Sequence, residues 1–76
     1  MYRFLVIIEK GEQSYGAYAP DLPGCVAVGD TQEEVEQNMR AAIALHLQGM
    51  VEDHEPIPTP VTMAEYIEVS LPGSVT

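Results

Sequence analysis

Residues 30–50 read DTQEEVEQNMRAAIALHLQGM and contain the one long helical pattern of this chain. Apolar side chains recur there at helical spacing, which predicts a helix with one buried stripe. The stripe consists of Val35, Met39, Ala42, Ile43, Leu47 and Met50. Thr31, followed three residues later by Glu34, forms a capping box, which is typical of a helix start. Three prolines at residues 56–60 prevent the helix from continuing and favour an extended connector. We therefore expect one helix that begins after Thr31 and frays near residues 52–55.

Three β-strands are predicted before this helix and one after it. Residues 2–9 are rich in β-branched and aromatic side chains, and residues 14–19 and 25–29 follow after short connections. Because the first turn is too short for a crossover, the first two strands should form an antiparallel hairpin. Residues 63–71 form the last strand, and the helical crossover before it is compatible with parallel pairing in the same sheet. The order β-β-β-α-β predicts a single α+β domain over residues 1–76, with a mixed four-stranded sheet and one helix packed on one face.

One helix covers only one face of such a sheet, so the other face needs a different cover. Tyr2, Phe4, Val6 and Ile8 point one way along the first strand, and Leu5 and Ile7 are apolar positions on the opposite side. Self-association is the simplest way to cover that second apolar face. The sequence therefore predicts a homo-oligomer, either a dimer or a higher even-numbered assembly such as a tetramer.

The charge of the chain narrows the class of partner. Among 76 residues, twelve acids face three bases, which gives a formal net charge of -9 and a pI near 4.2. Direct binding to nucleic acid is not expected, because it needs lysine and arginine on the phosphates, whereas a basic partner is the natural complement. The longest apolar run, residues 4–8, is far shorter than the ~20 residues of a membrane span. We expect a cytoplasmic protein that binds no membrane.

Candidate catalytic and metal-binding side chains lack the spacing that such sites need. His46 lies on or beside the buried stripe, where a structural histidine is favoured over a metal ligand. Cys25 is a small strand cysteine or, if a base were beside it, a nucleophile. Glu65 and Glu68 fall on opposite faces of the last strand, and Val6 stands mid-strand where a metal-dependent nuclease of this plan needs an acid. We predict no catalytic residue, no cofactor and no metal site, and hence no enzyme.

The most distinctive local sequence is Pro20-Asp21-Leu22-Pro23-Gly24. Two prolines fix the backbone there and remove hydrogen-bond donors. One interpretation is a rigid strand connection with Leu22 tucked onto the core. The other is a preorganised recognition loop, since rigid exposed loops often carry binding residues. The candidate partner-binding residues are Asp21, Leu22, Pro23 and Gly24.

Several motifs together resemble those of HicB-type antitoxins. They are Tyr18-Ala19-Pro20-Asp21-Leu22-Pro23-Gly24-Cys25, Gly29-Asp30-Thr31 with Glu33-Glu34, Asn38, Ala42-Ile43 and Pro56-Ile57-Pro58. The resemblance covers roughly residues 2–71 and implies a degraded ribonuclease-H-like fold without catalytic acids. It also implies a cytoplasmic toxin–antitoxin role. The partner would be a HicA-like toxin, a small basic ribonuclease whose active site the antitoxin occludes.

Two features depart from the pattern of that family. Many members continue into a C-terminal DNA-binding domain, whereas this chain stops at Thr76, so operator binding by this chain alone is not expected. His54 stands near a position where the family often has glycine after the helix, which alters the helix cap without changing the fold. The alternative function is a stand-alone oligomeric interaction or scaffold domain with no toxin partner.

Overall fold

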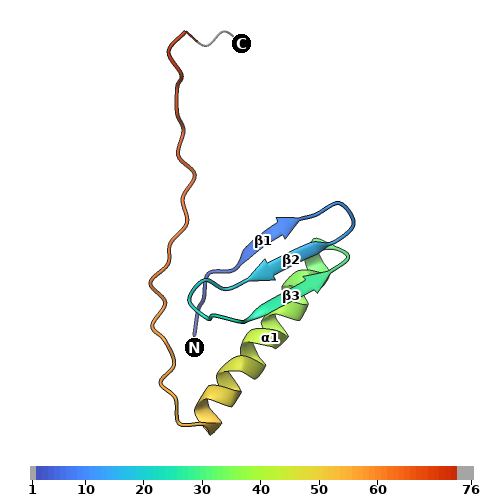
Figure 1. Ribbon diagram of the computed structural model, residues 1–76, viewed down its shortest axis with the longest axis vertical. Coiled ribbons are helices and arrows are strands. Elements are labelled where there is room, and N and C mark those ends of the chain that lie inside the picture. Colours follow the sequence, from blue (N-terminus) through green and yellow to red (C-terminus); the bar gives the residue numbers. More distant parts are fainter. Residues whose placement is uncertain (1, 74–76) are drawn as a thin grey trace.

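The computed structural model describes residues 2–73 and contains three strands and one helix. The strands are β1 (Ile7–Lys10), β2 (Tyr15–Tyr18) and β3 (Val26–Gly29), and the helix is α1 (Gln32–Glu52). The sheet has the order β1-β2-β3 with both pairs antiparallel, and α1 lies along one face of it (Figure 1). The α+β class, the hairpin and the single helix are confirmed.

The core is a single layer between the sheet and α1. Its buried members are Ala17, Ala19, Leu22, Cys25, Val35 and Met39. Partly buried side chains pack around them: Phe4, Val6, Ile8, Tyr15, Ala27, Ala42, Ile43 and Leu47. Five of the six residues of the predicted helical stripe are in this list, and Met50, near the end of α1, is half-buried outside it. Along the first strand, the side that carries Phe4, Val6 and Ile8 packs against this core. So few buried side chains make a thin core, as expected for a chain this short.

The helix begins at the predicted capping box. The Thr31 hydroxyl accepts a hydrogen bond from the Glu34 backbone N–H at 3.0 Å. The Glu34 carboxylate in turn accepts from the Asp30 N–H at 3.1 Å, one residue earlier than in the standard box. These bonds satisfy backbone donors that a helix start leaves without intrahelical partners.

The helix ends in a turn that points the chain away from its axis. The Glu55 N–H donates to the Met50 carbonyl at 2.8 Å, and the His54 N–H donates to the Val51 carbonyl at 3.1 Å. This is the pairing of a Schellman motif, in which the residue after the cap is left-handed and is usually glycine. His54 occupies that position with φ of 59°, which is where the sequence departs from the resembled family.

The first strand is shorter than predicted. β1 begins at Ile7, which pairs with Tyr18 at the end of β2. After Tyr18 the chain leaves β2 and forms the loop that leads to β3. Residues 2–6 therefore have no β2 residues opposite them with which to form backbone hydrogen bonds. Residues with strong β-propensity therefore remain outside the sheet, because a strand requires a partner as well as a suitable sequence.

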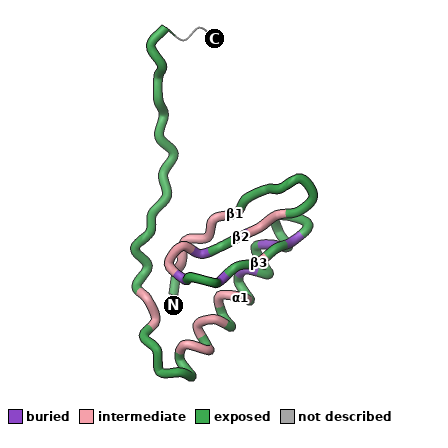
Figure 2. The backbone as a smooth tube through the Cα atoms, in the orientation of Figure 1, coloured by how far each residue is buried: buried purple, intermediate pink, exposed green. Residues whose placement is uncertain are grey.

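The prediction of a fourth strand within this chain is wrong. Residues 55–73, here called the tail, contain no strand, and the described part of the chain forms a three-stranded antiparallel sheet instead of a mixed four-stranded one. The tail runs extended past the end of the sheet that holds the N-terminus (Figure 1). It is exposed almost throughout, apart from half-buried Ile57 and Pro58 (Figure 2). The prolines favour this extended course, and no neighbouring strand lies along residues 63–71 to form a ladder with them.

Candidate partner-binding surface

The Pro20–Gly24 loop is held in place by backbone hydrogen bonds. The Leu22 N–H donates to the Ala19 carbonyl and the Cys25 N–H donates to the Leu22 carbonyl, both at 3.0 Å. The Ala19 N–H closes the base of the loop by donating to the Cys25 carbonyl at 3.3 Å. Gly24 has φ of +84°, a conformation that side chains with a Cβ avoid. The loop is therefore ordered by its own chain.

The four residues predicted to bind a partner have different environments. Leu22 is only 1% exposed and belongs to the core, so its side chain is not available for contact and its assignment to the binding site is corrected. Its apolar side chain gains more from burial in the core cluster that includes Val35 and Met39 than from exposure to water. Pro23 and Gly24 are exposed. The loop thus combines a buried anchor with an accessible tip.

Asp21 binds the tail of its own chain. One carboxylate oxygen accepts from the Thr62 hydroxyl at 2.7 Å. The other accepts from the backbone N–H groups of Val61 at 3.2 Å and Thr62 at 3.1 Å. The Thr62 hydroxyl and then its N–H hold the pKa of Asp21 below the ordinary value of 3.8, against a smaller opposing effect of desolvation. Sequence reasoning missed this contact, because nothing local links positions 40 residues apart.

The sheet has an apolar face that α1 does not cover, here called the bare face. Ile7 pairs with Tyr18, and Tyr18 pairs with Val26, so these three side chains form a row across the strands. Val26 is 63% exposed, and Val28 beside it is also exposed. Tyr18 precedes the Pro20–Gly24 loop and Val26 follows it, so the row and the loop form one continuous region. Exposed apolar patches of this kind mark interaction sites.

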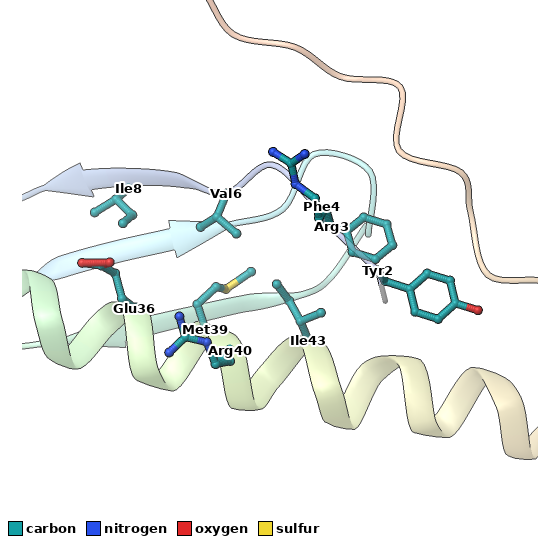
Figure 3. A pocket seen from close by; sticks show the side chains of 9 residues that line it. All are labelled: Tyr2, Arg3, Phe4, Val6, Ile8, Glu36, Met39, Arg40 and Ile43. Carbon is teal, nitrogen blue, oxygen red and sulfur yellow. The ribbon is translucent and has the colours of Figure 1, made fainter.

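A groove of about 410 Å³ lies between the N-terminal segment and α1 (Figure 3). It is lined by Tyr2, Arg3, Phe4, Val6, Ile8, Glu36, Met39, Arg40 and Ile43. The apolar side chains occupy the space between strand and helix, and the rings of Tyr2 and Phe4 stack with centroids 6.5 Å apart. The polar side chains of the groove are one carboxylate, Glu36, two guanidinium groups, Arg3 and Arg40, and the Tyr2 hydroxyl.

Residues 2–73 contain no group of three or more histidine, cysteine or acidic side chains arranged to hold a metal ion. Cys25 is buried, and its burial raises the pKa of the thiol. A thiol that stays protonated is a poor nucleophile, so the structural interpretation of this residue is favoured. Within the described part of the chain, no helix has the length and apolarity that a membrane span requires.

The sequence is similar to several known proteins. The family of HicB-like antitoxins of bacterial toxin–antitoxin systems matches residues 4–71. An uncharacterized 14.9 kDa protein of Haemophilus phage HP1 is 40% identical over 82% of this chain and 47% of its own length. A UPF0150 protein of Synechocystis is 39% identical over 76% of this chain and 75% of its own length. Antitoxin HicB 2 of Photorhabdus laumondii is 33% identical over 96% of this chain and 52% of its own length. The chain thus spans about half the length of the phage and Photorhabdus relatives.

The fold is also similar to a solved structure. A chain of the HicA3 and HicB3 toxin–antitoxin complex superposes with a TM-score of 0.67 at 27% sequence identity. The match covers 79% of this chain and 70% of that chain. The resemblance noted in the loop, the helix start and the proline segment is therefore confirmed over nearly the whole sequence. The chain belongs to the HicB-like antitoxin family of bacterial toxin–antitoxin systems.

Proposed function

We propose that this chain acts as an antitoxin that binds a HicA-type toxin in the cytoplasm and covers its active site. The observation that supports this most is the match with a chain of a solved HicA3 and HicB3 complex, at 27% identity over 79% of this chain. In that role the chain is a binding protein and not an enzyme. The toxin expected from the family resemblance is a small basic ribonuclease, and a net charge of -9 complements it.

The proposed docking surface is the bare face together with the tip of the Pro20–Gly24 loop. Tyr18 and Val26 lie side by side on that face, and tyrosine is among the residues that most often dominate binding energy at interfaces. Pro23 and Gly24 project from a loop that its own hydrogen bonds already order. A preordered loop loses little conformational entropy on docking, which favours affinity.

A growth assay tests this function. A HicA-type toxin, sought in the reading frame adjacent to that of this chain, is expressed in a bacterial host, alone and together with the chain. We expect the toxin alone to arrest growth and co-expression to restore it. A Val26→Asp variant should fail to restore growth, because it places a charge in the apolar row.

Leu45→Asp provides the matched control. Leu45 is an exposed apolar residue on α1, away from the bare face, and its substitution adds the same charge. This variant should rescue growth as the native chain does. If the native chain is folded and abundant but growth stays arrested, the antitoxin proposal fails, and the alternative of a scaffold domain without a toxin partner gains support.

A further inference from the structure

Two segments of the chain have β-forming sequences and yet lack a strand partner. In residues 63–71 of the tail, every second side chain is apolar except at Glu65. The four apolar side chains of this row are Met63, Ile67, Val69 and Leu71. All four are exposed. The other segment is the outer edge of β1 together with residues 2–6, which no strand covers among the described residues. An uncovered edge presents free backbone donors and acceptors that favour pairing with another chain.

The geometry of the single chain keeps these two segments apart. The Asp21 carboxylate fixes the tail at Val61 and Thr62, beside the start of the first strand. A hollow of about 550 Å³ lies there, lined by residues 2–6 with Pro60 and Thr62. Beyond this point the tail continues away from the sheet and does not turn along β1 (Figure 1).

The overall dimensions show how far the tail departs from its own core. The radius of gyration is 16.3 Å and the longest extent is 57 Å. A compact domain of this length has a radius of gyration of roughly 11 Å. The apolar side chains of residues 63–71 therefore lie outside the part of the molecule that could bury them.

The charges of the two segments are complementary. Two of the three bases in the chain, Arg3 and Lys10, stand near the two ends of residues 2–10. Residues 63–71 of the tail contain Glu65 and Glu68 and no base. Opposite charges on adjacent strands stabilise their pairing, and like charges oppose it.

We infer that residues 63–71 of one copy add as a β-strand to the free edge of β1 in a second copy, and that the second copy does the same in return. The exchange gives the free backbone N–H and C=O groups at the β1 edge of each sheet hydrogen-bond partners. It also buries the apolar row of each tail. Reciprocal exchange closes a two-fold symmetric dimer. The predicted fourth strand is thereby supplied by the partner copy, and the bare face is not used. This inference does not depend on the identity of the toxin.

Sedimentation equilibrium of the full chain at micromolar concentration tests the dimer. We expect twice the chain mass of 8.3 kDa for the native protein. Ile67→Asp should halve the measured mass, because a carboxylate in the exchanged apolar row disfavours its burial. Leu45→Asp, an equally charged substitution at an exposed site on α1, should leave the dimer intact. A native protein that stays at 8.3 kDa would overturn the inference, and so would a dimer that Ile67→Asp leaves unchanged.

Cross-linking distinguishes exchange from a fourth strand folded within one chain. A Leu5→Cys/Ile67→Cys chain is treated with a short bis-maleimide and separated under denaturing conditions. Exchange predicts covalent dimers, whereas cross-links confined to single chains would contradict it. A Val28→Cys/Ile67→Cys chain, with its first thiol on β3 at the opposite edge, should give no dimer. Both experiments omit the toxin, so their failure is distinguishable from failure of the proposed antitoxin function.

Discussion

Asp21 connects the loop before β3 to the tail through three hydrogen bonds that its carboxylate accepts from Val61 and Thr62. Because a carboxylate can be protonated, this contact depends on pH. The Thr62 hydroxyl and backbone N–H lower the pKa of Asp21 in the folded chain. A lowered pKa means that the anchor is fully formed above the ordinary value of 3.8 and is lost as pH falls through the lowered value. The tail should therefore stay anchored at neutral and mildly acidic pH.

An NMR titration measures this anchor directly. The amide resonance of Thr62 should shift with a midpoint below the ordinary pKa of Asp21, 3.8. In an Asp21→Ala variant this titration step of the Thr62 resonance should be absent. A Thr62 midpoint at or above 3.8 in the native protein would show that the carboxylate does not hold the tail.

Gly29 is the residue whose lack of a side chain matters most for packing. A Cβ atom built there would lie 2.6 Å from the Val35 backbone nitrogen and 2.9 Å from its Cα. These are backbone atoms at the start of α1, so the helix would have to move. We expect Gly29→Ala to reduce the free energy of unfolding by about 1–3 kcal/mol, the usual cost of overpacking.

Gly49 is the matched control for that substitution. It lies within α1 and a Cβ there meets nothing within 4 Å. Gly49→Ala should increase the free energy of unfolding by about 0.5–1 kcal/mol, since alanine has the higher helix propensity. Urea denaturation of both variants provides the comparison. Equal effects of the two substitutions would indicate that β3 and α1 are not in close backbone contact.

At the scale of elements, the sequence predicted the parts whose determinants are local. The capping box at Thr31 sets the helix start, and short turns set the antiparallel hairpin. The prediction from sequence was wrong for the segment whose structure depends on contacts with residues distant in the chain. Residues 63–71 have a strand pattern, but the Schellman turn at His54 and the Asp21 anchor direct them away from the sheet. The Asp21 anchor leaves no signal in the local sequence, because its partners lie 40 and 41 residues away.

The candidate site was predicted in part for the same reason. The rigidity of the Pro20–Gly24 loop follows from its prolines, and hydrogen bonds confirm it. Which loop side chains point inward depends on the space above α1. The sequence therefore leaves open whether Leu22 contacts a partner or packs on the core, and the structure places it in the core. The register that aligns Ile7, Tyr18 and Val26 likewise depends on how the strands pair.

The loop therefore contains two separable roles, which substitutions should resolve. Leu22→Ala should lower the free energy of unfolding by about 2–5 kcal/mol, the range for truncating a buried leucine. Pro23→Ala should change stability little, because the ring is exposed, but it should raise the dissociation rate of the toxin complex. Thermal denaturation and surface-based kinetics separate the two effects. A stable Leu22→Ala variant would contradict the core position of that side chain.

At the scale of the whole molecule, the net charge of -9 should raise the rate at which the chain associates with a basic toxin. Opposite net charges steer the encounter, and salt screens the attraction. We expect the association rate to fall several-fold between low and physiological salt, while the dissociation rate changes much less. Stopped-flow mixing at two salt concentrations gives both rates. An association rate that does not respond to salt would remove electrostatic steering from the proposed mechanism.

The central claim is that the bare face and loop of this HicB-like chain bind a HicA-type toxin. Calorimetric titration of the purified toxin with the native chain, Val26→Asp and Leu45→Asp measures this most directly. We predict saturable binding for the native chain and Leu45→Asp. For Val26→Asp we predict at least a tenfold loss of affinity, equivalent to about 1.4 kcal/mol. Unchanged affinity in folded Val26→Asp would contradict the assigned surface, and absence of binding by the native chain would contradict the claim itself.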